Sequence, residues 1–178
     1  MSQKIGIYFG TDTGRTRRIA KLIAQKLGSR ANAPVNIGRA DLDAFLAHEF
    51  LILGTPTLGE GELPGLSVGL SQGSWEEFLP LLQGQDMSGA TVALFGLGDQ
   101  DKYGNEFVDA LTLIYDAVLA CGARVVGAWA VDGYNFKASQ ALIDGQFVGL
   151  ALDQINQPLL TEQRLEAWLQ EIRPELLA

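Results

Sequence analysis

Three apolar stretches of the chain each run into a loop that contains glycine, and this repetition restricts the possible folds more than any other feature. The stretches are KIGIYF at residues 4–9, FLILG at 50–54 and TVALFG at 91–96. FLILG contains no polar side chain, which is typical of a parallel strand that is covered on both faces. Helical patterns separate the stretches. The alternation predicts an α/β fold with a doubly wound, five-stranded parallel sheet flanked by helices.

The helical patterns have apolar residues at intervals that form one buried face. In residues 15–27, Ile19, Ile23 and Leu27 follow this spacing, and Gly28 is a suitable stop. Ser74 precedes a further helix. We expect helices at 15–27, from Asp41 to about Phe45, at 74–82 with a capping box between Ser74 and Glu77, at 105–121 and at about 162–172. We also expect a short strand at 35–37 and a fifth strand that starts at 124–130 and resumes at 147–152.

The length and charge of the chain indicate one soluble domain over residues 1–178. Apolar residues make up 47% of the sequence, which is enough for a sizeable core. The formal net charge of −8 repels nucleic acid and anionic membranes. Such a surface either favours partners with a basic docking face or is simply solvated.

Cysteine and histidine usage excludes several further classes. Cys121 is the one cysteine, so an intramolecular disulfide is impossible, and a reducing, cytoplasmic location fits. We interpret Cys121 as a buried structural thiol. His48 is the one histidine, which argues against a metal site. No stretch approaches the roughly 20 apolar residues of a membrane span. We therefore expect a cytoplasmic monomer without a membrane segment or a metal.

The loops at 10–16, 54–61 and 96–104 follow the three apolar strands. Ligands of doubly wound sheets bind at the carboxyl ends of the strands, close to the point where the strand order reverses. We therefore expect these three loops to converge and to build one site from separate segments of the chain.

The first loop, in FGTDTGRT at residues 9–16, has the character of a phosphate-binding turn. Thr11, Thr13 and Thr16 offer hydroxyl donors, and Gly14 permits close approach of the backbone. The free amides of the following helix point at the same place. These groups suit a phosphate monoester. An ordinary strand-to-helix turn is the alternative.

Two nucleotide-binding motifs do not fit this loop. Gly10 and Gly14 are one residue too close for a Walker P-loop, and Arg15 stands where that motif has lysine. The dinucleotide fingerprint G-x-G-x-x-G is also absent. The missing lysine argues against a nucleoside triphosphate.

Four segments in order resemble the flavodoxin family over residues 3–173. They are TDTGRT at 11–16, TPTLGEGELPG at 55–65, GLGDQDKY at 96–103 and GLALDQINQ at 149–157. The segment at 131–149 resembles the insertion that interrupts the fifth strand of long-chain flavodoxins. With Leu58 where many long-chain relatives have tryptophan, the chain most resembles the flavodoxins that donate electrons to nitrogenase.

The resemblance implies FMN as cofactor and a role for each loop. Residues 11–16 would hold the phosphate, with Asp12 and Arg15 contributing mainly amides. Tyr103 would stack on the flavin ring and Leu58 would cover its inner face, while the main chain at 96–99 would bind the pyrimidine edge. Asp153 would lie near the ribityl hydroxyls. The implied cofactor-binding residues are Thr11, Asp12, Thr13, Gly14, Arg15, Thr16, Thr55, Pro56, Thr57, Leu58, Gly59, Gly96, Leu97, Gly98, Asp99, Tyr103 and Asp153.

The implied function is that of a low-potential one-electron carrier that uses the couple between the flavin semiquinone and hydroquinone. An apolar slot would penalise the negative charge of the reduced ring. The acidic residues Glu60, Glu62, Asp99 and Asp101 would add repulsion, and whether Lys102 turns toward the ring is left open. A flip of the Gly59–Glu60 peptide would present the Gly59 carbonyl to flavin N5–H.

The implied partners are redox proteins. The resemblance points to nitrogenase iron protein as acceptor and to a pyruvate- or NADPH-linked reductase as donor, with no catalytic residue in the chain itself. One alternative is an enzyme, an FMN-dependent NAD(P)H:quinone reductase of flavodoxin-like fold. Another is a regulatory domain that binds no flavin. The insertion at 131–149 either shapes docking or extends the fold.

Overall fold

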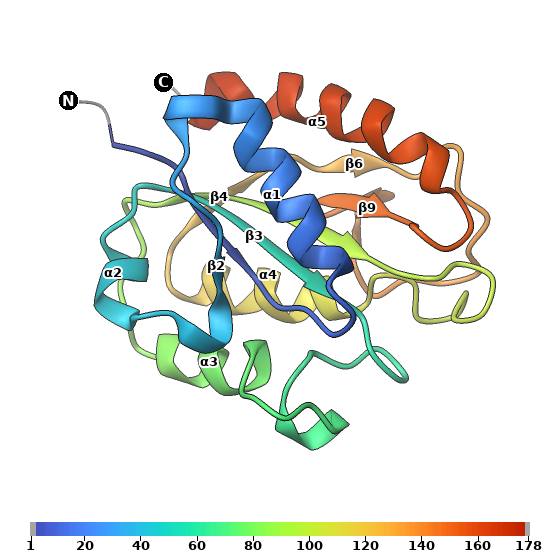
Figure 1. The fold of residues 1–178 in the computed structure, drawn as a ribbon, viewed down its shortest axis with the longest axis horizontal. Helices are drawn as coiled ribbons and strands as arrows, with labels where there is room; N and C mark the ends of the chain where they lie inside the picture. The colour runs from blue at the N-terminus through green and yellow to red at the C-terminus, as the bar shows by residue number, and fades with distance from the viewer. Residues whose placement is uncertain (1–2, 177–178) are drawn as a thin grey trace.

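The computed structural model describes residues 3–176, and a parallel sheet forms its centre (Figure 1). The strand order is β2 (Val35–Asn36), β1 (Gly6–Phe9), β3 (Phe50–Pro56), β4 (Thr91–Leu97) and β5 (Arg124–Val126), and every neighbouring pair is parallel. The order reverses between β1 and β3. This is the predicted doubly wound fold.

The edge beside β4 is shared by two short strands. The first part of β4, from Thr91 to Ala93, pairs with β5, and the last part pairs with β9 (Leu150–Leu152). β5 and β9 are therefore two halves of one interrupted edge strand, as predicted, although β9 begins at Leu150 rather than at residue 147. The chain between them forms a separate antiparallel sheet of β6 (Trp129–Ala130), β8 (Gln146–Phe147) and β7 (Leu142–Ile143).

Helices cover both faces of the sheet. On one face, α1 (Arg15–Leu27) and α5 (Thr161–Leu176) pack on Ile52, Ala93 and Phe95. On the other face, α2 (Leu42–Leu46), α3 (Trp75–Leu82) and α4 (Ala110–Ala120) pack on Leu51 and Leu53. Successive strand residues point to opposite faces, so a strand covered on both sides has no polar position. This arrangement explains the wholly apolar FLILG.

Two predicted helix starts are confirmed. Asp41 caps α2, since its Oδ2 accepts a hydrogen bond from the Ala44 amide at 2.9 Å. At the start of α3, Glu77 Oε1 accepts from the Ser74 amide at 2.8 Å, which is one half of the predicted capping box, whereas Ser74 Oγ is buried without a hydrogen-bond partner among the described residues. Short 3₁₀ helices complete the fold: η1 (Gly28–Arg30), η2 (Ile37–Arg39), η3 (Leu66–Val68) and η4 (Pro158–Leu160).

The predicted fifth strand was wrong beyond Val126. Trp129 and Ala130 belong to the small antiparallel sheet rather than to the central one. Gly127 has φ +87°, which turns the chain out of the strand, and its carbonyl accepts a hydrogen bond from Trp168 Nε1 at 2.9 Å. The hydrogen bond from α5 to the Gly127 carbonyl therefore ends β5 early, and the local sequence does not indicate this contact.

The predicted start of α4 at residue 105 was also wrong, because α4 begins at Ala110. Val108 has φ +51°, which a helix does not allow. The Phe107 amide donates to the Ala138 carbonyl at 3.3 Å instead of continuing a helix. The preceding residues are thus held by the 131–149 insertion.

Three further features of residues 3–176 concern membrane helices, metal clusters and the cysteine. None of the helices within 3–176 has the length and apolar character to cross a bilayer. Over the same residues, no cluster of His, Cys, Asp and Glu is suited to hold a metal ion. Cys121 is buried, as expected, and its Sγ donates to the Leu82 carbonyl at 3.1 Å. Burial raises the pKa of this thiol, and the Asp86 charge adds to the increase.

Candidate functional site

A pocket lies where the loops after β1, β3 and β4 meet the loop after β9. Its cavity volume is about 210 Å³, and it opens to solvent at its mouth. A second hollow adjoins the mouth of this pocket and is lined by Gly59, Glu62, Val68 and Leu70. The pocket itself is lined by Asp12, Thr13, Arg15, Thr16, Pro56, Thr57, Leu58, Leu97, Gly98, Asp99, Lys102, Tyr103, Glu106, Gln154 and Ile155.

One end of the pocket is the N-terminus of α1. Gly14 precedes the helix with φ +92°, a conformation that favours glycine, and no side chain caps the helix. The first amides of an α-helix have no partner inside the helix. The first turn of α1 contains no acidic residue, and Arg15 lies at its start. This end of the pocket is therefore built to attract an anion.

The hydroxyl groups of the loop are arranged for the same task. Thr11 Oγ1 accepts a hydrogen bond from the Gly14 amide at 3.0 Å, and Thr13 Oγ1 accepts from Arg15 at 3.3 Å. A hydroxyl that accepts from the protein keeps its own O–H to donate. Thr16 lines the pocket and is almost fully buried. The donors present fit a phosphate monoester.

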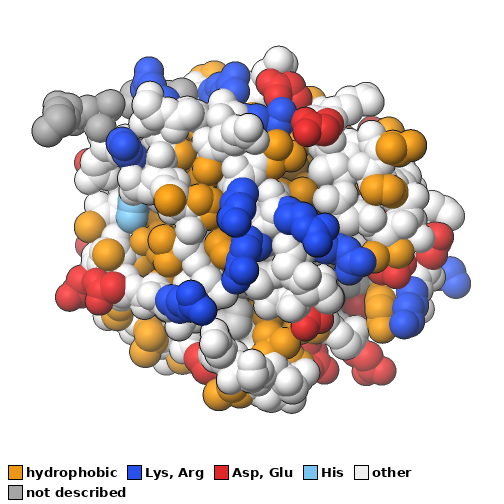
Figure 2. Space-filling view, viewed as in Figure 1, with side chains coloured by type: hydrophobic (Ala, Val, Ile, Leu, Met, Phe, Trp, Pro, Cys, Tyr) orange, Lys and Arg blue, Asp and Glu red, His pale blue; other side chains and the backbone are white. Residues whose placement is uncertain are grey.

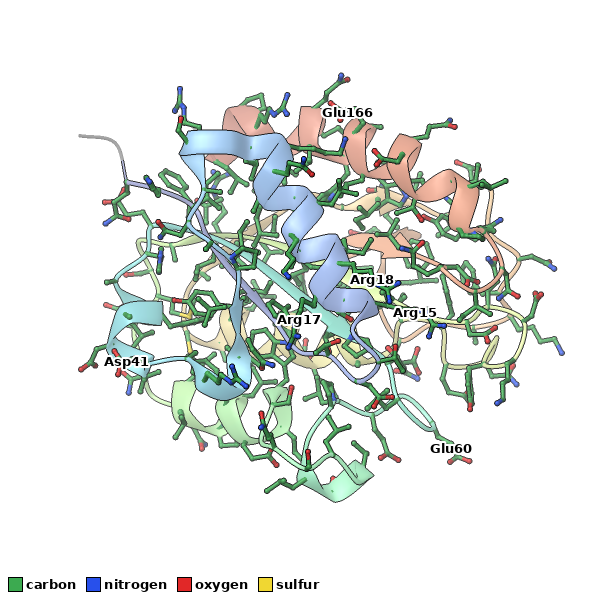
Figure 3. All side chains as sticks on the ribbon, viewed as in Figure 1. Arg15, Arg17, Arg18, Asp41, Glu60 and Glu166 are labelled. Carbon is green, nitrogen blue, oxygen red and sulfur yellow. The ribbon has the colours of Figure 1, made fainter. Side chains whose placement is uncertain are left out.

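The second loop is a tight turn anchored at its base. The Thr57 amide donates to the Leu97 carbonyl at 3.1 Å, and Thr57 Oγ1 accepts from the Ala110 amide at 3.1 Å. Leu58 and Glu62 exchange two backbone hydrogen bonds of 2.9 and 2.7 Å. Gly59 has φ +51°, so the turn uses the glycine that the sequence places there. Glu60 projects from the tip of the turn (Figure 3).

The third loop is shaped by the carboxylate of Asp99. Its Oδ1 accepts from the amides of Asp101 and Lys102 and from Asn156 Nδ2, at 3.2, 2.9 and 2.8 Å. Burial acts to raise the pKa of Asp99, but these hydrogen bonds outweigh it and hold the pKa below its usual value. The Tyr103 amide donates to the Asp99 carbonyl at 2.9 Å. Asp99 therefore stays ionised and fixes the loop that carries Tyr103.

The two side chains expected to enclose a ring both line the pocket. Leu58 comes from the second loop, and Tyr103, 39% exposed, comes from the third. Lys102 also lines the pocket, and its Nζ lies 5.3 Å from the centre of the Tyr103 ring. Lys102 therefore lies on the side of the pocket that carries Tyr103. The positive charges of Lys102 and Arg15 oppose the repulsion that the acidic side chains of the loops would exert on a negatively charged ligand.

The structure brings most of the predicted residues to the pocket. Those that line it or its mouth are Asp12, Thr13, Arg15, Thr16, Pro56, Thr57, Leu58, Gly59, Leu97, Gly98, Asp99 and Tyr103. Thr11 and Gly14 shape the turn beside it, and Thr55 and Gly96 lie inside β3 and β4 without lining it. The sequence reasoning missed Glu106, Gln154 and Ile155 as lining residues.

Asp153 is placed differently from the expectation. It does not line the pocket, and its side chain is almost fully buried. Its carboxylate accepts from the amides of Gln100, Ile155 and Asn156 and from the side chains of Gln100 and Asn156. With both oxygens occupied, this carboxylate joins two loops instead of facing a ligand. In the same segment, GLALDQINQ, the two residues after Asp153 line the pocket instead, Gln154 and Ile155.

A group of cations lies beside the site on an otherwise acidic protein. Arg15, Arg17, Arg18 and Lys21 are exposed on α1, and Figure 2 shows Lys and Arg side chains gathered over this helix. Figure 3 shows Arg15, Arg17 and Arg18 at its N-terminal end. We call these four residues the α1 basic strip. It gives the mouth of the pocket one positive side.

Comparisons with known proteins agree with this geometry. The sequence model of the family described as Flavodoxin matches residues 7–168. This chain belongs to the flavodoxin family. A flavodoxin of Klebsiella pneumoniae is 54% identical over 173 residues, which cover 97% of this chain and 98% of that protein. A flavodoxin of Enterobacter agglomerans is 53% identical over 174 residues, with the same coverage of both chains.

Solved flavodoxin structures share the fold. The Fusobacterium nucleatum flavodoxin bound to flavin mononucleotide has a TM-score of 0.88 and 34% identity, and the match covers 98% of this chain and 99% of that one. Oxidised flavodoxin 2 from Bacillus cereus, at 24% identity, has a TM-score of 0.68 and shows the fold alone. The flavodoxin-like α/β fold predicted from the sequence is therefore confirmed.

Proposed function

We propose that this chain binds FMN in the pocket and works as a one-electron carrier between redox proteins. The observation that carries the proposal is the junction of two features in one pocket. An uncapped helix N-terminus with hydroxyl donors forms one end, and the slot between Leu58 and Tyr103 forms the other. The first fits a phosphate and the second an aromatic ring. The FMN bound to the Fusobacterium nucleatum flavodoxin supports this choice of ligand.

Each loop of this chain would hold one part of the cofactor. The amides and hydroxyls of residues 11–16 would bind the phosphate, as the free donors of Thr11 and Thr13 allow. The main chain of Gly98 and Asp99 would bind the polar edge of the ring. Bound FMN would supply the exchange of single electrons. The protein would orient the ring and set the charges around it.

The charge environment of the slot would favour a low reduction potential. Leu58 and Tyr103 would exclude water from the ring faces, and an unpaired charge costs more free energy in such surroundings. Asp99 stays ionised in the same loop and repels negative charge on the ring. Lys102 and Arg15 act in the opposite direction. The Gly59 carbonyl would accept a hydrogen bond from N5–H of the ring when this nitrogen is protonated, because glycine permits either orientation of the peptide.

We propose nitrogenase iron protein as the electron acceptor and a pyruvate- or NADPH-linked reductase as the donor. The support is the resemblance of FGTDTG and of TLGEGELPG, with Leu58, to the flavodoxins that donate to nitrogenase. Stopped-flow mixing of the reduced holoprotein with oxidised iron protein tests the acceptor. Rapid oxidation of the flavin is expected. A reaction no faster than that with an unrelated iron–sulfur protein would contradict this assignment.

Titration of the flavin-free protein with FMN tests the cofactor. We expect one FMN per chain, with quenched flavin fluorescence as the ring enters the slot. A steady-state assay with NAD(P)H and a quinone then separates carrier from enzyme. Rapid turnover without a reductase would contradict the carrier, and a protein that does not take up FMN would contradict the proposed function as a whole.

A further inference from the structure

The side chain of Gln100 joins three segments that are far apart in the chain. It is almost fully buried, although glutamine is usually exposed. Its Nε2 donates to Asp153 Oδ2 at 2.8 Å, and its backbone amide donates to the same oxygen at 3.0 Å. Its Oε1 accepts from the Asn135 amide. Gln100 thus connects the 98–104 loop to the 131–149 insertion and to the loop after β9.

A second contact holds the same loop on the other side of Tyr103. The amides of Lys137 and Ala138 both donate to the Gly104 carbonyl, at 2.7 and 2.9 Å. Gly104 is packed closely, since a Cβ there would lie 2.6 Å from the Gln100 carbonyl oxygen. The insertion therefore forms hydrogen bonds with the loop three residues before Tyr103 and one residue after it.

The insertion is itself firmly seated, so it can act as a support. The Tyr134 hydroxyl donates to the Ala151 carbonyl at 2.5 Å and accepts from Trp129 Nε1 at 2.9 Å. The rings of Phe136 and Phe147 pack on Phe107, with centroids 5.5 and 5.8 Å away. A segment fixed by hydrogen bonds and aromatic packing transmits its position to the loop that it contacts.

We propose that Gln100 is a positioning residue through which the 131–149 insertion sets the place of Tyr103 against the bound cofactor. This inference rests on the proposed function, because Tyr103 is the residue that would stack on FMN. The insertion then supports the 98–104 loop, which carries Tyr103. Gln100 suits the task because one amide side chain both donates to Asp153 and accepts from Asn135, which neither leucine nor glutamate can do.

The variant Gln100→Ala removes both side-chain bonds and tests the proposal. FMN affinity, measured by fluorescence titration, should fall about tenfold, since the loop must then be ordered when the ring binds. The visible circular dichroism of bound FMN should also change, because it reports the geometry of the aromatic contact. In the flavin-free protein, amide exchange at residues 101–104 should become faster. Gln100→Glu keeps the acceptor for Asn135 but places an oxygen against Asp153, and it should change all three readouts in the same direction.

Tyr134→Phe is the matched control. It removes a hydroxyl of the insertion that also joins two partners, but both partners, Trp129 and Ala151, lie outside the 98–104 loop. The ring of residue 134 still packs on Phe107 and Phe147 and keeps the insertion seated, so FMN affinity and exchange at 101–104 should stay close to wild type. Equal effects in Gln100→Ala and Tyr134→Phe would overturn the proposal, because general loosening of the insertion would then suffice. If the wild-type protein takes up no FMN, the proposed function fails, whereas the exchange difference between the variants still decides whether Gln100 holds the loop.

Discussion

The Arg164 guanidinium lies 3.9 Å from the centre of the Tyr134 ring and ties helix α5 to the inserted segment. Arg164 is 8% exposed and has no carboxylate partner among the salt bridges of the described residues. Its NH1 donates to Gln157 Oε1 at 2.8 Å and its NH2 to the Gly133 carbonyl at 3.0 Å. A buried cation is thus held by neutral acceptors and an aromatic face.

Arg164→Met should destabilise the fold because it removes both hydrogen bonds and the contact with the ring. We expect the free energy of unfolding to fall by about 2 kcal/mol. Urea denaturation measures this value. Arg124→Met is the control, since Arg124 forms an exposed ion pair with Glu175, and such pairs contribute about 0–1 kcal/mol. An equal loss in both variants would contradict the assigned role of Arg164.

Gly10→Ala should disturb the junction beneath the pocket. A Cβ at Gly10 would lie 2.6 Å from Trp75 Cδ1 and 2.8 Å from Ser74 Oγ. Trp75 cannot easily move, because its Nε1 donates to the Gly54 carbonyl at 2.8 Å. We expect a loss of about 1–3 kcal/mol on unfolding in urea.

Gly89→Ala serves as the control for Gly10→Ala. A Cβ at Gly89 meets no atom within 4 Å, and its φ is not positive. Its stability should be unchanged or slightly higher, since alanine restricts the unfolded chain. A loss at Gly10 no larger than that at Gly89 would show that the junction can relax.

Reversing two charges of the α1 basic strip should slow the reaction with anions. In Arg17→Glu/Arg18→Glu the net charge changes from −8 to −12, because two cations become two anions. At low salt, oxidation of the reduced holoprotein by ferricyanide should slow severalfold, and oxidation by hexaammineruthenium(III) should accelerate. Stopped-flow absorbance measures both rates. In 1 M salt the Debye length is about 3 Å, so the differences should disappear.

Lys4→Glu/Arg30→Glu is the charge-matched control for this pair. Lys4 precedes β1 and Arg30 follows α1, so both lie at the end of the sheet away from the pocket. The total charge also becomes −12, but the local potential at the pocket should change less. Equal slowing in both double variants would show that net charge alone governs the reaction, and the strip would then have no separate effect.

Asp109 should make the fold less stable as the pH rises. Burial raises the pKa of this carboxyl, although the hydrogen bond from the Gln140 amide acts in the opposite direction, and the Glu106 charge adds to the increase. A raised pKa in the folded state means that ionisation favours the unfolded chain. The stability that the neutral carboxyl contributes is complete below its unfolded pKa and is lost as the pH rises through the folded value.

Asp109→Asn should therefore flatten the dependence of stability on pH above about pH 4, the unfolded pKa of aspartate. The asparagine oxygen can still accept from the Gln140 amide, which donates to Asp109 Oδ1 at 2.7 Å. Thermal unfolding between pH 4 and 8 measures the effect. Asp116→Asn, at an exposed position of α4, is the control. An unchanged pH dependence in Asp109→Asn would contradict the prediction.

Local patterns were enough to predict the central sheet and the place of the site. FLILG and TVALFG are apolar throughout because both faces of β3 and β4 are covered, and the loops after such strands meet at one edge. Helix starts set by neighbouring residues, such as Asp41 at α2, were also predictable.

Features set by distant contacts were not predictable. β5 ends at Val126 because Trp168 binds the carbonyl of Gly127, and α4 starts late because the insertion binds Phe107. Asp153 faces the protein for the same kind of reason, as Gln100 occupies its carboxylate. Each of these errors came from a hydrogen bond between segments that are 30 or more residues apart.

The two midpoint potentials of bound FMN, measured by spectroelectrochemical titration, test the central claim most directly. The account predicts two resolved one-electron steps, with the lower potential clearly more negative than that of free FMN, because the slot and the ionised Asp99 disfavour negative charge on the ring. A single two-electron step at the potential of free FMN would contradict the claim that this chain is a low-potential one-electron carrier.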